Sequence, residues 1–282
     1  MPTSSLLDKC CLLGQSVAGN PTHYMIEQAL SAAELDWRFL TFEVTPAHLA
    51  AALRGLEVLG FHGVKLDESL AELAATHVSE QTDLARRAGA VDCLVRTGER
   101  LVGHSVAGQA LAKLVERSEP LRGQQALIVG AGAQSRVIGA ALAATEVGRI
   151  LIVSPDDDAT QTLVSQLNDG AESAVAEMVI WPDETFSIPP ETRLFVRTTP
   201  VQKKSPELPL EPQSINNQTI VADLEIGPSR SPLLRAAASR GSVTIDGTQA
   251  FVAEIAFALR LWTGVDVNEA VLADAAEEFM GM

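Results

Sequence analysis

Cysteine is scarce in this sequence, and so are aromatic residues, basic residues and long apolar runs. Three cysteines in 282 residues are too few for a disulfide framework. Cys10 and Cys11 are adjacent and precede two leucines, which is typical of small apolar side chains buried in a strand of a protein kept reduced. The sequence contains no Cys-x-x-Cys pair and no cluster of cysteine with histidine, so we expect no metal site.

Positive charge is also in short supply, because 21 lysines and arginines face 36 aspartates and glutamates. The formal net charge of −15 opposes binding to nucleic-acid phosphates and to anionic membranes, so we expect neither as a partner. No apolar run approaches the roughly 18 residues that would span a bilayer, and no N-terminal segment resembles a secretory signal. We expect a cytoplasmic monomer or homodimer that acts on a small molecule.

The sequence is rich in short apolar runs that alternate with helical patterns. Runs such as 9–14, 125–129 and 149–153 have strand character, and segments with helical spacing follow them. One stretch, AVDCLVRTGERLVG, has the form of a β-hairpin with Thr97 and Gly98 at its turn. Alternating strands and helices are typical of sheets with helices on both faces. We therefore predict an α/β protein whose second part is a doubly wound, Rossmann-type parallel sheet.

The strand pattern at 125–129 leads into a glycine-rich turn, Gly130-Ala131-Gly132, and then into a helix of small residues. Gly130 permits the tight turn, and Gly132 permits the backbone to approach a pyrophosphate, which the N–H groups at the start of the helix can bind. Ser135 replaces the third glycine of the usual dinucleotide fingerprint. The pattern predicts a site for NAD or NADP, although a tight strand-to-helix turn without a ligand has the same form.

The end of the next strand bears on the choice of cofactor. Asp156, Asp157 and Asp158 follow that strand, about 20 residues after the glycines, where an acidic side chain bonds the ribose 2′-hydroxyl of NAD. The same charge repels the 2′-phosphate of NADP, so the aspartates favour NAD. They are equally suited to capping the helix that follows, and the two roles are compatible.

Five segments combine into a recognisable series. They are AGAVDCLVRTGERLVGHSVAG at 88–108, GAGAQSR at 130–136, RTTPV at 197–201, VADLEIGPSRSPLL at 221–234 and DGTQAFVAEIAFALRLWTG at 246–264. In this order and spacing the series resembles the motifs of the shikimate dehydrogenase family. The resemblance implies a substrate domain from 1–104 and 253–282 and a dinucleotide domain from 105–252. It also implies hydride transfer between NAD(P) and shikimate or a related cyclic hydroxy acid of aromatic amino-acid biosynthesis.

The resemblance also implies where cofactor and substrate bind. The expected cofactor contacts are Gly130, Ala131, Gly132, Ala133, Gln134, Ser135, Ser154, Asp156, Thr198, Thr199, Leu224 and Gly247. The expected substrate contacts are Asn20, Lys65, Asp67, Asp92, Ser105 and Glu254.

The sequence departs from the family pattern at the expected substrate site. The catalytic lysine and aspartate of the family align with Ala71 and Ala107, while two asparagines that touch the substrate align with Lys65 and Asp92. In one interpretation the site is inactive and the chain only binds a nucleotide or a metabolite. In the other, Lys65 and Asp92 are the catalytic pair and face each other, because an acid or base placed beside the substrate speeds proton transfer. A third possibility is a solvated lysine at a strand end and a polar group in a turn.

Charge at this site points away from an anionic substrate. The serines that hold the substrate carboxylate in the family are shortened here to Gly19-Asn20-Pro21, and Asp67 and Glu254 replace a threonine and a glutamine. Lys65 is the one clear positive charge nearby in the expected site that offsets these two carboxylates. A neutral or amine-bearing substrate is therefore as well matched as shikimate.

Overall fold

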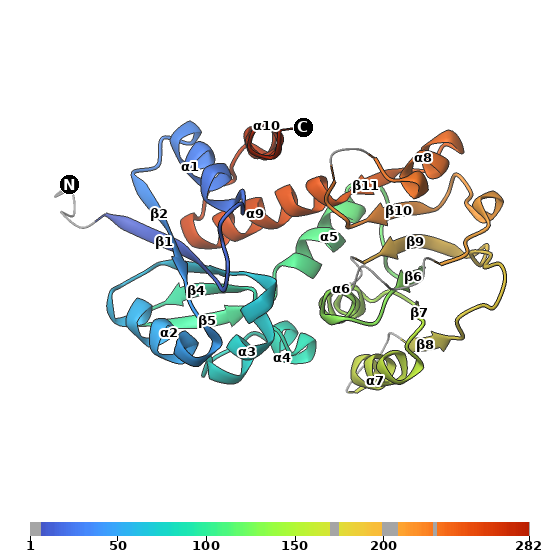
Figure 1. Cartoon of the computed structure of the whole chain (residues 1–282), viewed down its shortest axis with the longest axis horizontal. Coiled ribbons are helices and arrows are strands. Elements are labelled where there is room, and N and C mark those ends of the chain that lie inside the picture. The colour runs from blue at the N-terminus through green and yellow to red at the C-terminus, as the bar shows by residue number, and fades with distance from the viewer. Residues whose placement is uncertain (1–6, 170–174, 199–207, 228–229, 282) are drawn as a thin grey trace. The chain divides into compact units, whose positions relative to one another are not determined.

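The computed structural model describes residues 7–169, 175–198, 208–227 and 230–281 (Figure 1). The chain divides into two compact units, one comprising Met1–Val106 with Phe251–Met282 and the other Ala107–Ala250. Each unit is a β-sheet with helices, which confirms the predicted α/β class. Among the described residues, no helix combines the length and apolar character required to cross a bilayer.

The first unit is built on a five-stranded mixed sheet of order β2-β1-β3-β4-β5. The strands are β1 (Asp8–Gly14), β2 (Trp37–Glu43), β3 (Gly63–Leu66), β4 (Cys93–Thr97) and β5 (Arg100–His104). Strand β1 runs parallel to β2 and β3, whereas β4 is antiparallel to both β3 and β5. The predicted hairpin is confirmed as β4 and β5.

Helices cover both faces of this sheet. One face carries α1 (Thr22–Ala32), α9 (Gly247–Thr263) and α10 (Glu269–Met280), and the other carries α2 (Leu49–Val58), α3 (Glu68–His77) and α4 (Asp83–Ala88), with the short 3₁₀ turn η1 (Pro46–His48) before α2. The alternation of side chains along a strand accounts for the two layers. In β1, Cys10 and Leu12 pack with the first set of helices, and Cys11 and Leu13 pack with the second. Burial raises the pKa of both thiols, so these cysteines serve as apolar core residues, as the sequence predicted.

The second unit is a six-stranded parallel sheet of order β11-β10-β9-β6-β7-β8. Its strands are β6 (Gln125–Val129), β7 (Arg149–Val153), β8 (Val175–Val179), β9 (Thr192–Arg197), β10 (Ile220–Asp223) and β11 (Thr244–Asp246). Its helices are α5 (Ala107–Glu116), α6 (Ala133–Ala144), α7 (Asp157–Asn168) and α8 (Pro232–Ser239), with a 3₁₀ turn η2 (Pro212–Ser214). The strand order reverses between β6 and β9, and ligands of doubly wound sheets bind at the carboxyl ends of strands at such a point.

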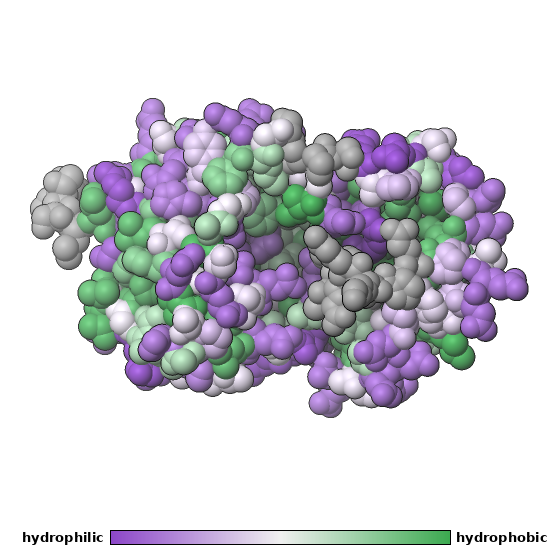
Figure 2. All heavy atoms as spheres, in the orientation of Figure 1, coloured by the Kyte–Doolittle hydropathy of each residue, from purple (hydrophilic) through white to green (hydrophobic). Residues whose placement is uncertain are grey.

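The surface reflects the composition. Figure 2 shows hydrophilic residues over much of the face in view, with apolar side chains among them. A folded protein lacks enough polar surface to cover itself, so scattered apolar exposure is ordinary.

Candidate functional site

The glycine turn of the second unit has a geometry that a side chain would destroy. Gly130 follows β6 with a φ of +117°, and a Cβ on it would lie 2.3 Å from Oγ1 of Thr198. Gly132 occupies the N-cap position of α6 and brings no side chain to cap it. The first N–H groups of a helix have no partner within the helix, so they are suited to an anion.

Two hydroxyl groups fix the turn against the neighbouring strand end. Oγ of Ser135 lies 3.0 Å from Oγ1 of Thr198, which also donates a hydrogen bond of 2.9 Å to the carbonyl oxygen of Val129. Ser135 is fully buried, so a larger side chain has no room there. The structure therefore brings together three of the expected cofactor contacts, whereas Thr199 lies outside the described residues.

The end of β7 lies beside the same turn. The Gly130 N–H donates to the carbonyl oxygen of Val153 over 2.8 Å, and Oγ of Ser154 accepts a hydrogen bond from the N–H of Asp156. One carboxylate oxygen of Asp156 accepts from the N–H of Ala159 at 2.9 Å, so Asp156 caps α7. The capping role foreseen from the sequence is thus present, and Asp156 remains exposed to solvent.

The remaining cofactor candidates lie at the ends of β9 and β10. The N–H of Leu224 donates to the carbonyl oxygen of Arg197 at 3.0 Å, and a Cβ on Gly247 would come within 2.8 Å of the carbonyl oxygen of Leu224. The described candidates therefore gather at the carboxyl edge of one sheet. A glycine cradle beside an uncapped helix start fits the pyrophosphate of a dinucleotide, which residues 130–135 would hold. The nicotinamide of the same dinucleotide would supply the hydride.

An ion-pair network at this edge was missed by the sequence analysis. The guanidinium of Arg197 donates to both carboxylate oxygens of Asp223, at 2.9 Å and 2.6 Å, and lies 3.1 Å from Glu225. Asp223 is only 1% exposed and also accepts a hydrogen bond from Ser231. Arg197 and Asp223 both stand in the motif segments at strand ends, which was the available signal.

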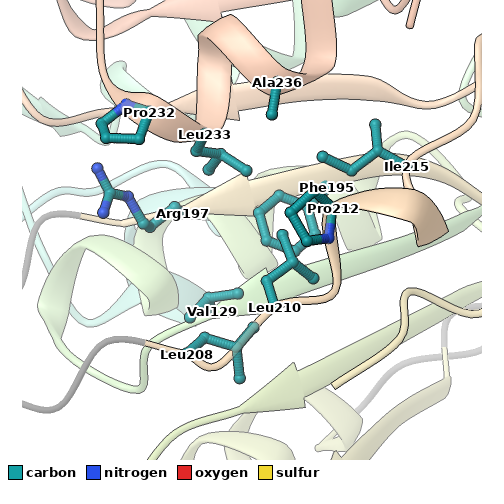
Figure 3. A pocket seen from close by; sticks show the side chains of 10 residues that line it. All are labelled: Val129, Phe195, Arg197, Leu208, Leu210, Pro212, Ile215, Pro232, Leu233 and Ala236. Atoms are coloured by element: carbon teal, nitrogen blue, oxygen red, sulfur yellow. The ribbon is translucent and has the colours of Figure 1, made fainter. Parts of the chain in front are cut away.

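A small apolar cavity lies next to Arg197 (Figure 3). It has a volume of about 200 Å³ and is lined by Val129, Phe195, Arg197, Leu208, Leu210, Pro212, Ile215, Pro232, Leu233 and Ala236. Pockets that bury a drug-sized ligand usually have about 300–1,000 Å³. The lining includes Val129 and Arg197, which directly precede Gly130 and Thr198, but none of the residues 130–135.

In the first unit, the candidate site centres on Lys65 in the buried strand β3. Lys65 pairs with Leu12 of β1 and Cys93 of β4, so its side chain lies on the sheet face that α1, α9 and α10 cover. The residue is 6% exposed. The alternative of a solvated lysine at a strand end is therefore wrong.

The Lys65 ammonium is fully engaged by acceptors. Nζ lies 2.8 Å from Oε1 of Glu254 and donates to the carbonyl oxygens of Leu66 at 2.9 Å and of Asp92 at 3.2 Å. An ammonium has three N–H donors, and here each has a partner. Burial lowers the pKa of Lys65, but Glu254 and Asp92 outweigh it and raise the pKa above its usual range. Lys65 is therefore charged at neutral pH.

Asp92 makes separate contacts through its backbone and its side chain. Its carbonyl oxygen meets Lys65, whereas its carboxylate Oδ1 accepts a hydrogen bond of 2.7 Å from the N–H of Val106. The carboxylate of Glu254, on α9, is in ion-pair contact with Lys65. The sequence analysis named Glu254 as a substrate contact but did not foresee this pair.

The other candidates of this unit are partly used by the backbone. Asp67 caps α3 and accepts a hydrogen bond of 2.8 Å from the hydroxyl of Ser69, and the side-chain oxygen of Asn20 accepts one of 2.9 Å from the N–H of Thr22. Helix α1 begins at Thr22, the residue whose N–H Asn20 bonds. Within the described residues, the buried hydroxyl of Ser105 has no hydrogen-bond partner. A buried polar group without a partner is unusual and is consistent with a ligand or water contact.

Glu68 adds to the negative field around Lys65 and was not singled out from the sequence. Partial burial of its carboxyl group raises the pKa of Glu68, and the charges of Asp67 and Glu254 raise it further. Ala71, the position of the family's catalytic lysine, is buried and offers no polar side chain.

Comparison with known proteins finds relatives of this chain both by sequence and by structure. No family model matches the chain. A shikimate dehydrogenase (NADP(+)) of Halobacterium salinarum is 30% identical over 265 residues, which are 90% of this chain and 94% of that protein. The ligand-free 5-ketofructose reductase of a Gluconobacter strain has a TM-score of 0.90 at 26% identity, covering 98% of this chain and 99% of that one. Shikimate 5-dehydrogenase of Listeria monocytogenes, solved with shikimate and NAD, has the same fold, with a TM-score of 0.84 at 20% identity and 98% coverage of both chains.

Two kinds of observation therefore agree. The glycine cradle and the strand order are those of a dinucleotide-binding sheet, and the sequence match to the Halobacterium enzyme extends over nearly the whole of both proteins. The chain belongs to the shikimate dehydrogenase family of NAD(P)-dependent oxidoreductases.

Proposed function

We propose that this protein transfers hydride between NAD(P) and a neutral polyhydroxy carbonyl compound, with Lys65 as the acid and with Asp92 and Glu254 beside it. The observation that carries the proposal is the buried contact of 2.8 Å between Nζ of Lys65 and Glu254. A lysine and a carboxylate thus lie together in the first unit, although Ala71 and Ala107 align with the family's catalytic positions.

The chemistry asks for one proton at the carbonyl oxygen when the carbonyl carbon is reduced. An alkoxide is far more basic than an amine, so a lysine ammonium can supply that proton. Lys65 stays protonated because Glu254 and Asp92 offset its burial. Its longest hydrogen bond, 3.2 Å to the carbonyl oxygen of Asp92, is the one most readily exchanged for a bond to the substrate.

The charge balance of the site supports a neutral substrate. The Lys65 ammonium lies near the carboxylates of Asp92, Glu254 and Glu68, and each of these charges interacts electrostatically with it. A substrate carboxylate would meet net negative charge there. The structural relative at 26% identity, 5-ketofructose reductase, is named for a ketose without charge.

We also propose that NAD is preferred over NADP. Asp156 and its two acidic neighbours follow β7 at the edge where the ribose of a dinucleotide is expected. Asp156 uses one oxygen to cap α7, which leaves the other for a ribose hydroxyl. A higher kcat/KM with NADPH than with NADH would contradict this preference.

The deciding experiment measures NADH and NADPH oxidation with 5-ketofructose and with 3-dehydroshikimate. We expect turnover of the ketose to exceed that of the acid, and we expect Lys65→Ala and Asp92→Asn each to abolish it. Lys113→Ala, at an exposed lysine of α5, is the matched control and should retain activity. Unchanged activity in both site variants would refute the assignment of Lys65 and Asp92.

The two alanines favour one competing function, that of a binding protein without catalysis. Cofactor or ketose would then raise the melting temperature, by an amount equivalent to about 2.7 kcal/mol at 100 times the Kd, while no NAD(P)H is consumed. That pair of results would replace the enzymatic proposal.

A further inference from the structure

Helix α9 holds Glu254 rigidly over the sheet. Ile255 and Leu259, on the same helix, are fully buried in the core that covers β1 and β4. The indole N–H of Trp262 donates to the carbonyl oxygen of Leu94 at 2.9 Å. Gly63 makes room for that indole, since a Cβ there would lie 2.3 Å from it. The carboxylate of Glu254 therefore reaches Lys65 from a helix whose following turns are anchored in this core.

The three acceptors of Lys65 differ in what they can do for it. Leu66 and Asp92 offer neutral carbonyl oxygens, which orient an N–H group but do not neutralise a charge. Glu254 accepts with a charged group, at 2.8 Å from Nζ, and the two side chains are only 8% and 16% exposed. A buried cation that loses its counter-charge tends to lose its proton.

We infer that Glu254 is a positioning residue for Lys65: its carboxylate fixes the ammonium against β3 and supplies the negative charge that this buried cation requires. The inference rests on the proposed role of Lys65 as the acid of the reaction. Glu254 itself transfers no proton to the substrate in this scheme. It acts through the orientation and the protonation state of Lys65.

Several titratable groups face Lys65 and have to be considered together. They are Glu254 on α9, Asp92 and Cys93 at the start of β4, and Glu68 on α3, and His104 shares the sheet face through its pairing with Cys93. Burial raises the pKa of Cys93, so this thiol is neutral, and burial lowers the pKa of His104, so this imidazole is neutral above about pH 7. Burial is the largest influence on the pKa of Lys65 and lowers it, and Glu254 is the largest of those that raise it. Without the Glu254 carboxylate 2.8 Å from Nζ, we expect burial to outweigh the remaining charge of Asp92.

A readout that needs no catalysis follows from this balance. In the wild type, Lys65 is protonated in both the folded and the unfolded chain between about pH 7 and pH 10, so it adds no pH dependence to stability there. In Glu254→Gln its folded pKa falls below the unfolded value of about 10.4, and the unfolded chain then binds more protons. The urea midpoint of the variant, relative to wild type, should therefore rise with pH across this window.

Two further variants test whether the changed pH dependence of the urea midpoint comes from the Lys65–Glu254 pair. Glu254→Asp keeps the charge and should restore the wild-type pH dependence, while Lys65→Met in the Glu254→Gln background should remove the slope. Glutamine is the residue that the family pattern has at this position, so the variant is compatible with the fold. Parallel pH dependence of the urea midpoints of wild type and Glu254→Gln would overturn the inference.

The pH profile of kcat/KM tests the same point during turnover. We expect the wild-type profile to show no basic decline up to about pH 10, and the Glu254→Gln profile to decline within the window of about pH 7 to pH 10. A merely structural role would lower kcat/KM equally at every pH, which counts against the inference. A wild type without turnover but with the expected urea slope in Glu254→Gln would refute the proposed reaction while supporting the coupling. Turnover without that slope would refute the positioning role alone.

Discussion

The ion pair between Lys65 and Glu254 makes a quantitative prediction about stability. The two side chains are 8% and 16% exposed, and Nζ and Oε1 are 2.8 Å apart. Removing one partner of a buried pair costs about 3–5 kcal/mol, because the other charge is left buried without compensation. Given the residual exposure of Glu254, we expect Lys65→Met and Glu254→Met each to lower the free energy of unfolding by about 3 kcal/mol, the lower end of that range.

The double variant should be far less destabilised than the sum of the two single variants. Replacing both charges with apolar side chains of similar length removes the uncompensated charge, and such replacements are often close to neutral. Two carbonyl oxygens, those of Leu66 and Asp92, still lose a donor, which costs about 1–3 kcal/mol for a group left unsatisfied. The coupling energy should therefore be about 3 kcal/mol.

Urea unfolding of wild type, both single variants and the double variant gives this coupling energy directly. The exposed pair of Arg100 and Glu80 is the matched control, because its side chains are 60% and 49% exposed. Its coupling should be no more than about 1 kcal/mol. A coupling below about 0.5 kcal/mol at Lys65 and Glu254, the level at which distant sites are additive, would refute the pair as described.

Three further outcomes follow from the geometry. Gly130→Ala should abolish the stabilisation by NADH in a thermal-shift assay, because it forces a Cβ to 2.3 Å from Thr198 at a φ of +117°. Gly98→Ala is the control and should keep this stabilisation, because Gly98 has a φ of +63° and open space around it. Burial lowers the pKa of His104, so on acidification the unfolded chain binds a proton at this residue at a higher pH than the folded chain does. The free energy of unfolding should therefore fall as the pH drops below about 6.5. In His104→Gln this part of the pH dependence of the urea midpoint should vanish. Asp156→Ala removes the cap of α7 and should lower the free energy of unfolding by about 1 kcal/mol; it should also reduce the kcat/KM preference for NADH over NADPH, and an unchanged preference would contradict a ribose contact.

The hairpin and the glycine turn could be predicted from the sequence because their signals are local. The Thr97-Gly98 turn between two strand runs predicted the β4–β5 hairpin, and the glycines after an apolar run predicted the turn that opens α6. Such features depend on residues a few positions apart, where turn geometry and side-chain periodicity leave little choice. The motif series likewise identified the family, since its residues serve the shared fold.

The contacts of Lys65 in the first unit were decided by the tertiary structure. Lys65 stands in a strand whose residues are all buried, and nothing local indicates which face of the sheet its side chain occupies. Its pairing with Leu12 and Cys93 assigns it to the face under α9, and only the packing of that distant helix sets Glu254 beside it. A charge pair between remote elements has no signature in sequence spacing, because register and helix packing, and not chain distance, determine the contact.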